Sequence, residues 1–126
     1  MLKNVMQPQE IEVFYIIPAI RSHLARYMKE SGKSQKDIAE LFGLRESTVS
    51  QYITKKRATL HIEKSIQEKI KKIAAKIKTP IDTVSAIQDI LEEIKKKQCI
   101  CTIHRQVASK IPNNCRACLF ARRRLI

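Results

Sequence analysis

Four cysteines lie within twenty residues of one another near the C-terminal end of this 126-residue chain, and residues 1–97 contain none. They form two close pairs, Cys99 with Cys101 and Cys115 with Cys118, and thirteen residues separate the pairs. That length of chain can fold back on itself, so that four thiolates surround one metal centre. Sites of this kind bind zinc or an iron–sulfur cluster. The spacing therefore predicts a metal or cluster site formed by these four side chains.

A second ligand set stays open, because Cys101 and His104 are also spaced as a chelating pair. In that set His104 replaces Cys99 as the fourth ligand. We favour the four cysteines, with His104 beside the site or as an alternate ligand. A disulfide framework is disfavoured, because we expect a cytoplasmic chain and cytosolic thiols stay reduced.

Two features favour an iron–sulfur cluster over structural zinc. The Cys-x-Cys pair departs from the Cys-x-x-Cys pairs of structural zinc ribbons, and apolar neighbours would shield a cluster from solvent. Those neighbours are Ile100, Ile103, Leu119 and Phe120. A cluster would respond to oxidation and make the segment a redox or iron sensor, whereas Zn²⁺, the alternative, would make it a structural clasp. The spacing matches neither common ferredoxin pattern, so it does not define the cluster type.

The charge of the chain predicts a polyanionic partner. Lysine and arginine number 25 against 12 aspartate and glutamate residues, a formal net charge of +13. Nucleic acid is the polyanion that a small basic protein most often binds. No phosphate-binding glycine loop or Ser-His-Asp arrangement can be identified, so we do not expect an enzyme. No apolar run reaches eighteen residues and the N-terminal stretch lacks a secretory signal, so we expect a cytoplasmic protein without a membrane span.

The elements that must position these groups are helices. Apolar residues recur at steps of three and four, and the chain has only two glycines. Five helices are expected, at about residues 8–31, 34–43, 46–55, 60–78 and from 80 onward. Pro18 should kink the first or split it in two. Ser34 and Thr79 are placed as N-caps, each with an aspartate three residues later, and Pro80 fits a first helical position.

Apolar stripes follow the last two predicted helices. The stripe on the fourth helix consists of Ile62, Ile66, Ile70, Ile73 and Ile77. The stripe on the fifth consists of Ile81, Val84, Ile87, Ile90 or Leu91, and Ile94. Both stripes are expected to pack, either inside the chain or against a second copy.

The segment "SQKDIAELFGLRESTVSQYITKKR", Ser34 to Arg57, has the pattern of two short crossing helices. Such a pair needs a small residue at the crossing and a residue that tolerates positive φ in the turn, here Ala39 and Gly43. Apolar side chains then hold the second helix on the first: Ile38, Phe42, Leu44, Val49 and Tyr52. Over these residues the chain resembles the lambda-repressor-like, or XRE, family of transcriptional regulators. The resemblance implies an all-α helix-turn-helix bundle, here with long C-terminal helices and a small Cys-rich tail.

A helix-turn-helix places its second helix in the major groove of double-stranded DNA. The residues expected to read bases are Arg45, Glu46, Ser47, Ser50, Gln51 and Thr54. Those expected to contact phosphates are Gln35, Lys36, Thr48, Lys55, Lys56 and Arg57. Because such helices usually act in pairs on pseudo-palindromic sites, we expect a homodimer.

These expectations divide the chain into three parts. Residues 1–58 form the DNA-binding domain, residues 59–97 pack and dimerise, and residues 98–126 form the Cys-rich tail. The alternative to a sequence-specific regulator is a basic RNA-binding or architectural protein. Three tyrosines and three phenylalanines offer few stacking platforms for single-stranded RNA, which disfavours that alternative.

Overall fold

The computed structural model describes residues 7–54 and 61–97, and these residues form helices and no strand. The elements are α1 (Pro8–Ile11), η1 (Glu12–Ile16, a π-helix), α2 (Ile17–Glu30), α3 (Gln35–Phe42), α4 (Glu46–Ile53), α5 (Lys64–Ala74) and α6 (Pro80–Lys96). This arrangement confirms the all-α helix-turn-helix bundle. The predicted helix from residue 46 to residue 55 ends earlier in the described chain, since Thr54 is already its C-cap.

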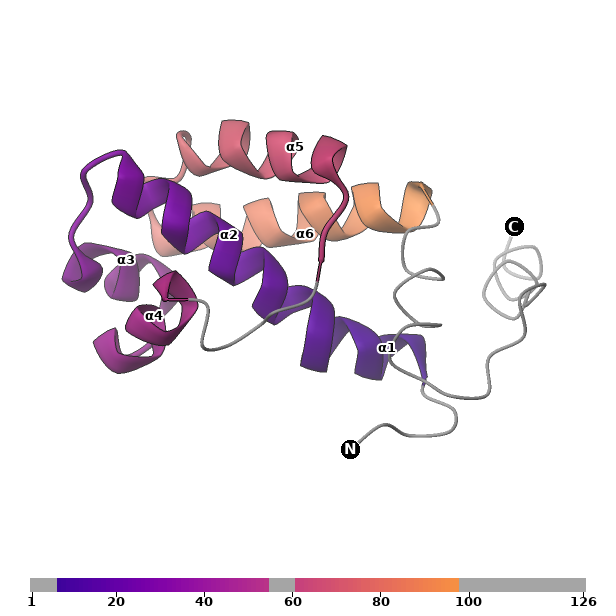
Figure 1. The fold of residues 1–126 in the computed structure, drawn as a ribbon, viewed down its shortest axis with the longest axis horizontal. Coiled ribbons are helices and arrows are strands. Elements are labelled where there is room, and N and C mark those ends of the chain that lie inside the picture. Colours follow the sequence, from indigo (N-terminus) through magenta and orange to yellow (C-terminus); the bar gives the residue numbers. More distant parts are fainter. Residues whose placement is uncertain (1–6, 55–60, 98–126) are drawn as a thin grey trace.

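The first predicted helix is one helical path with a widened turn inside it. Helix α1, η1 and α2 follow one another from Pro8 to Glu30 (Figure 1). Pro18 lacks an amide hydrogen and its ring crowds the carbonyl of Phe14, four residues earlier. The turn before it is a π-helix, in which the Ile17 amide donates to the Glu12 carbonyl five residues back. Pro18 therefore widens the helix locally, and the path is not split into two separate helices.

Capping residues fix the ends of α2 and α3. The Ser34 hydroxyl accepts a hydrogen bond from the Asp37 amide at 3.1 Å, which confirms Ser34 as the N-cap of α3. Both glycines are left-handed, with φ of 103° at Gly32 and 65° at Gly43. After each, the next residue's amide donates to the carbonyl five residues back, Lys33 to Met28 at 3.1 Å and Leu44 to Ala39 at 3.0 Å. This pattern is the Schellman ending of a helix.

Helix α5 is shorter than the predicted range of residues 60–78. Ile62 lies before its first residue and Ile77 lies after its last, yet both are buried. The Ile62 carbonyl accepts a hydrogen bond from Gln67 Nε2 at 2.6 Å, so the chain ahead of the helix is held by a side chain of its first turns. After Ala74 the chain leaves the helix through backbone hydrogen bonds between residues that lie three apart in the sequence. The isoleucine spacing predicted burial correctly but not the helix ends.

Helix α6 begins as predicted but turns a different face to the core. Thr79 and Asp82 form the reciprocal capping box, with Pro80 in the first turn. Ile81 and Val84 belong to the predicted apolar stripe but do not pack inside the chain, since they are 72% and 65% exposed. The buried residues are Thr83, Ala86, Ile90, Leu91 and Ile94. Small side chains thus face the bundle in the first half of α6. Helix α6 contacts α2, α3 and α5.

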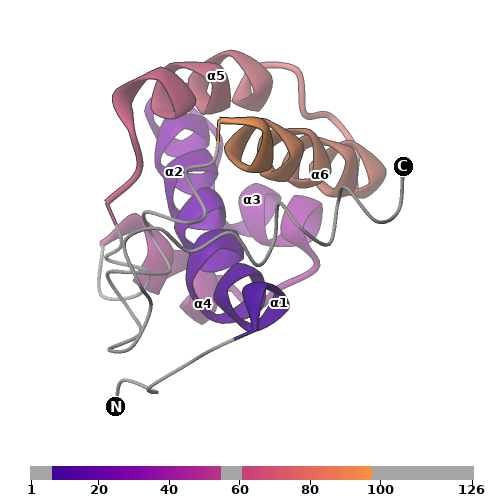
Figure 2. The same ribbon diagram turned by 90° about the vertical axis from the view of Figure 1, so that its right-hand side faces the viewer.

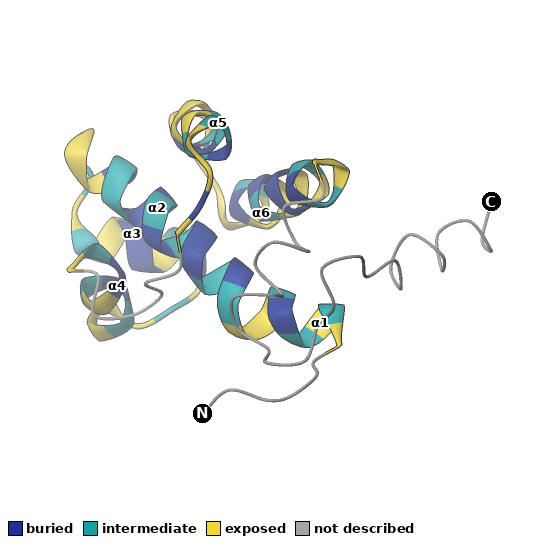
Figure 3. Ribbon diagram, turned by 45° about the vertical axis from the view of Figure 1, so that its right-hand side comes forward, coloured by how far each residue is buried: buried dark blue, intermediate teal, exposed yellow. Residues whose placement is uncertain are grey.

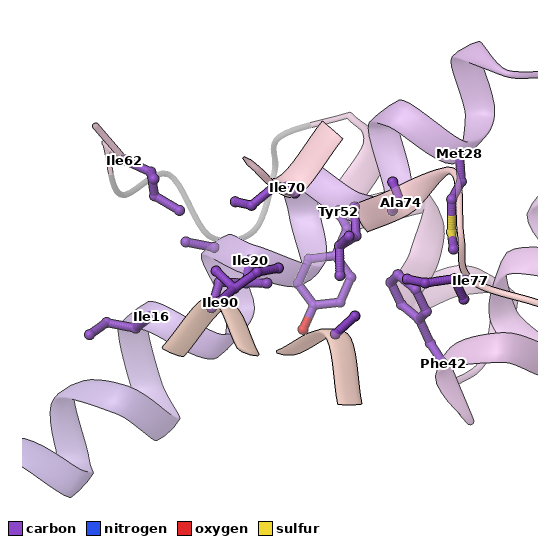
Figure 4. Close-up of a cluster of buried hydrophobic side chains, with 14 of the residues drawn as sticks. Ile16, Ile20, Met28, Phe42, Tyr52, Ile62, Ile70, Ala74, Ile77 and Ile90 are labelled. Carbon is purple, nitrogen blue, oxygen red and sulfur yellow. The ribbon is translucent and has the colours of Figure 1, made fainter. Parts of the chain in front are cut away.

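One hydrophobic core joins all the helices. Helix α2 contacts α3, α4, α5 and α6, and α4 and α5 lie on opposite sides of it (Figures 1 and 2). Each long helix has a buried and an exposed side (Figure 3). Tyr52 lies in the middle of the cluster, among isoleucines of α2 and α6 (Figure 4). Four of the five residues of the α5 stripe are fully buried and Ile73 is partly buried, so this stripe packs inside the chain.

Candidate nucleic-acid interface

Helix α4 has one apolar side and one polar side. Val49 and Tyr52 are buried at 0% and 3% exposure and anchor α4 to the core. An α-helix turns once in 3.6 residues, so Ser47, Ser50 and Gln51 share the face opposite these anchors. Ser47 and Gln51 are exposed and Ser50 is half-buried. The polar side of α4 is therefore open to a ligand along the length of the helix.

A buried hydrogen bond ties α4 to the central helix. The Ser22 hydroxyl donates to the Tyr52 carbonyl oxygen at 2.9 Å, and Ser22 is 1% exposed. Carbonyls in the last turn of a helix have no partner inside that helix, so this bond satisfies one of them. It also fixes the C-terminal end of α4 relative to α2. Sequence reasoning missed Ser22; the available signal was a polar residue in step with Ala19 and Ala25 on a buried face.

The turn between α3 and α4 sets the angle between the two helices. Gly43 supplies the left-handed conformation that ends α3, and no atom lies within 4 Å of the position where its Cβ would be. The requirement for glycine is therefore conformational, because a side chain would meet no neighbour there. Arg45 follows as the N-cap of α4, with extended backbone. The predicted roles of Ala39 and Gly43 in this crossing agree with the structure, since Ala39 is buried at 5% exposure.

The residues expected to read bases lie mostly at the surface of α4. Arg45, Glu46, Ser47, Gln51 and Thr54 are exposed. Within the described part of the chain Arg45 and Glu46 form no ion pair with each other. The Thr54 hydroxyl donates to the Ser50 carbonyl at 2.9 Å, which gives this residue a capping function at the end of the helix.

The residues expected to contact phosphates are only partly within the described chain. Lys36 is exposed on the first turn of α3, and Gln35 beside it is half-buried, as is Thr48 on α4. The amides at the start of α3 face the same end as Lys36, and such helix ends favour anions. The other three predicted phosphate contacts lie outside the described residues: Lys55, Lys56 and Arg57.

Carboxyl groups with a lowered pKa lie on α6, away from α4. The Lys78 amide hydrogen bond lowers the pKa of Asp82 in the capping box, and the Thr79 amide and hydroxyl act in the same direction. A hydrogen bond from Lys69 lowers the pKa of Glu93, and this pair joins α5 to α6 with an Nζ to Oε2 distance of 3.4 Å. Both effects stabilise the scaffold behind the polar side of α4.

The predicted metal ligands lie outside the described residues. They are Cys99, Cys101, Cys115, Cys118 and the alternate ligand His104. Residues 7–54 and 61–97 contain no group of three or more side chains that could hold a metal ion. None of the helices in this part of the chain is long and apolar enough to cross a membrane.

The fold and the polar side of α4 define an all-α helix-turn-helix protein. Comparison with protein families agrees: residues 24–62 match the family model described as Helix-turn-helix. The match covers the second half of α2 together with α3 and α4, and it supports the resemblance to XRE-type regulators. A domain of this family is a DNA-binding regulatory domain and not an enzymatic one. No curated protein and no solved structure matches the chain.

Proposed function

We propose that this protein is a sequence-specific DNA-binding transcriptional regulator whose α4 reads base edges in the major groove. The observation that carries the proposal is the polar side of α4, which is open to solvent while Val49, Tyr52 and the Ser22 hydrogen bond hold the other side. A helix fixed in this way presents its side chains without first having to become ordered. The helix-turn-helix match over residues 24–62 supports the same function.

Individual residues have distinct tasks in this proposal. Arg45 is suited to a bidentate contact with guanine and Gln51 to one with adenine, whereas Ser47 and Ser50 accept several bases. Lys36 contacts a phosphate, which adds affinity but no sequence information. The net charge of +13 supplies the long-range attraction to the duplex.

Comparing one base-reading variant with one phosphate-contact variant tests the proposal. Operators are first selected from a random duplex library with the full chain, and affinities are then measured by fluorescence anisotropy at fixed salt. We expect Gln51→Ala to weaken the selected operator by roughly tenfold to hundredfold and to leave a random duplex unchanged. Lys36→Gln should weaken both duplexes by a similar factor.

Two results would contradict sequence-specific duplex binding. Equal losses for Gln51→Ala and Lys36→Gln on both duplexes would mean that α4 does not read bases. Tighter binding to single-stranded RNA than to any selected duplex would favour the RNA-binding alternative.

We also propose a homodimer that pairs through the first half of α6. The α5 stripe packs inside the chain, whereas Ile81 and Val84 are exposed and lie three residues apart on one side of α6. A twofold axis lets such a patch meet its own copy. Because α6 contacts α3, pairing through α6 would bring two helix-turn-helix units together on a pseudo-palindromic operator.

Sedimentation equilibrium tests the pairing surface. Ile81→Asp should convert dimers to monomers, because it would bury two like charges at the axis. Lys72→Asp places the same side chain on the exposed face of α5 and should leave the dimer intact. A wild-type chain that is monomeric at all concentrations, or an Ile81→Asp variant that is still dimeric, would refute this surface.

We propose further that Cys99, Cys101, Cys115 and Cys118 bind an iron–sulfur cluster that acts as a redox or iron sensor. The support is the spacing of the cysteines and their apolar neighbours in the sequence. Structural zinc at the same ligands is the alternative. Protein purified without oxygen is analysed by visible absorbance and for iron, sulfide and zinc. Stoichiometric iron and sulfide support the cluster, and one zinc per chain without visible bands refutes it.

A sensor must also change DNA binding. Operator affinity is measured by anisotropy before and after oxidation of the cluster, with the Cys115→Ser variant as the control that cannot complete the four-thiolate site. We expect oxidation to weaken the wild-type complex and to leave the variant unchanged. Equal affinity of the wild type before and after oxidation would reduce the tail to a structural or unrelated role.

A further inference from the structure

The π-helix carries two large apolar side chains at the surface. Val13 is 56% and Phe14 is 60% exposed, and together they form what we call the η1 surface. Ile81 and Val84 are the other large apolar residues that are exposed in the described part of the chain. Apolar side chains that are adjacent and exposed lose contact with water when another segment covers them, which favours such a contact. In Figure 3 an exposed stretch lies between α1 and the buried side of α2.

The C-terminal end of α6 lies next to η1, on the side of Glu12. Lys95 Nζ and Glu12 Oε1 form an ion pair at 2.9 Å, and Glu12 directly precedes Val13. Helix α6 ends one residue after Lys95, so residues 98–126 follow directly after this contact. An extended chain covers roughly 3.5 Å per residue, so the three residues from Lys97 to Ile100 span about 10 Å and the six to Ile103 about 20 Å. That reach is enough to pass around η1 from the Glu12 side to Val13 and Phe14, because a helix with its side chains is about 10 Å across.

The sequence of the tail complements this surface through its apolar residues. Residues 98–126 contain apolar side chains at intervals along their length, among them Ile100, Ile103 and Phe120. Charge does not favour the pairing, because the tail is basic, residues 95–97 are all lysines, and Glu12 is already paired with Lys95. The apolar contact is what favours it.

We propose that the Cys-rich tail packs on the η1 surface of its own chain. Covering Val13 and Phe14 removes apolar surface from water, and tethering beside η1 makes the contact intramolecular, with a high effective concentration. The π-helix continues directly into α2, and α2 holds α4 through the Ser22 hydroxyl. The docked tail is thereby connected to the scaffold of α4 by one continuous helical path.

This inference deepens the proposed sensor function, because it names the surface on which a change in the tail would act. Only the regulatory meaning of the contact rests on that function. The contact itself can be tested without DNA and without any metal. A docked tail that holds no iron would refute the cluster and leave this proposal intact. A cluster that changes operator affinity in a chain whose tail does not dock would support the sensor function and refute this proposal.

Photo-crosslinking of the full chain tests the contact directly. Phe14 is replaced by p-benzoylphenylalanine, an isotopically labelled and an unlabelled preparation are mixed, and crosslinked peptides are identified by mass spectrometry. We expect crosslinks from position 14 to residues 98–126 of the same copy. Lys72 on the exposed face of α5 is replaced in the same way as the control and should give no such crosslinks. Position 14 crosslinking only to residues 7–97 of a second copy, or no more to the tail than position 72, would overturn the proposal.

A second measurement uses the absence of tryptophan from the chain. Phe14→Trp introduces a single fluorophore on the η1 surface, and acrylamide quenching reports whether it is covered. Quenching should be several-fold weaker than in Lys72→Trp, and Ile100→Asp with Ile103→Asp should raise it to the level of the control. Circular dichroism verifies that the helices remain. Equal quenching at positions 14 and 72 with the native tail would refute the docking.

Discussion

The α3–α4 pair and the α5–α6 pair bury apolar residues in the same core, but the sequence specifies the ends of α3 and α5 differently. Helix α3 starts after Ser34 and stops at Gly43, as expected from its caps. Helix α5 was expected over residues 60–78 and spans Lys64–Ala74. The difference teaches that capping residues define where a helix ends, whereas apolar spacing defines only which residues are buried.

The α5 stripe shows the second half of that rule. Ile62 and Ile77 are buried at 3% and 2% exposure although neither belongs to the helix. Both flanking segments turn their side chains into the core that α5 itself faces. Thr59, the capping residue type before the predicted start, lies outside the described residues, and the described chain enters the helix through Glu63, whose side chain forms no capping hydrogen bond. A stripe of apolar residues without caps is thus a prediction of burial and not of helix length.

The largest effect should come from the buried stripe of α5. Ile70→Ala removes a side chain with 0% exposure from the core that α5 shares with α2 and α4. We expect a loss of roughly 3 kcal/mol in the free energy of unfolding, from lost burial and the cavity left behind. Because the two helix pairs share one core, α4 should unfold together with α5. Urea unfolding is followed by circular dichroism and by the amide signals of α4 and α5. It measures the loss in the free energy of unfolding and shows whether the two helices unfold together.

Ile81→Ala is the matched control on the exposed side of α6. Ile81 is 72% exposed, so its truncation should change the free energy of unfolding of the monomer by less than about 0.5 kcal/mol. Any further loss should depend on protein concentration, as expected if Ile81 contacts a second copy. Separate unfolding of α4 and α5 in Ile70→Ala would show that the two pairs are independent.

The N-terminal half of α6 marks the limit of sequence reasoning about faces. Ile81 and Val84 fit a helical stripe with Ile94, but the buried positions are Thr83 and Ala86. Hydrophobicity alone cannot rank two offset stripes when the neighbouring helix leaves room only for small side chains. The Thr83 hydroxyl oxygen has no hydrogen-bond partner in the described chain, so this face was not chosen for its polarity. The buried face is the one that packs on the neighbouring helices α2, α3 and α5.

The next largest effect concerns the link between α4 and the central helix α2, which contacts both pairs. Ser22→Ala removes the hydroxyl that donates to the Tyr52 carbonyl and leaves a buried acceptor without a partner. We expect a loss of about 2 kcal/mol in the free energy of unfolding. Amide exchange in the last turn of α4 should accelerate by more than the global loss explains, because this end of the helix is released first.

Ser85→Ala on the exposed surface of α6 is the control. Its free energy of unfolding should stay within about 0.5 kcal/mol of the wild-type value. If Ser22→Ala is as stable as Ser85→Ala, the bond does not couple α2 to α4. If it is less stable but exchange in α4 changes only with the global loss, Ser22 stabilises the core without positioning α4.

Most of the candidate site could be predicted from the sequence, because its residues belong to a short local pattern. Gly43 and the anchors Val49 and Tyr52 lie at fixed intervals, and these intervals determine that Ser47 and Gln51 face outward. Ser22 could not be assigned its partner, because a contact across thirty residues depends on how the helices pack. Local pattern predicts the surface of the site, and packing determines how it is held.

A smaller effect should follow from changing the turn. Gly43→Ala puts a side chain on a residue with φ of 65°, and no atom lies close enough to clash. The expected loss is therefore conformational alone, about 1 kcal/mol in the free energy of unfolding. Gly43→Asn should lose less, because asparagine tolerates the left-handed region. Thermal unfolding of the two variants measures the difference. Equal losses in both would mean that the side chain itself, and not its conformation, disturbs the turn.

The smallest effect should be the pH dependence of the α6 cap. Hydrogen bonds from the Lys78 and Thr79 amides lower the pKa of Asp82 below its ordinary value of 3.8. The unfolded chain therefore binds the proton more readily than the folded chain. The stabilisation is fully present above about pH 3.8 and is lost as the pH falls through the lowered pKa. Asp82→Asn cannot titrate, so its unfolding temperature should depend less on pH in that range.

Thermal midpoints measured from about pH 7 down to about pH 2 at constant ionic strength test this linkage. The wild type should be the more stable chain at neutral pH, and its advantage over Asp82→Asn should shrink as Asp82 takes up its proton. Glu68→Gln is the control, because it removes a carboxylate from the exposed face of α5, away from the cap. A constant difference between wild type and Asp82→Asn across the range would show that the cap acts without its charge. The start of α6 would then be specified by Thr79 and Pro80 alone, as an uncharged cap.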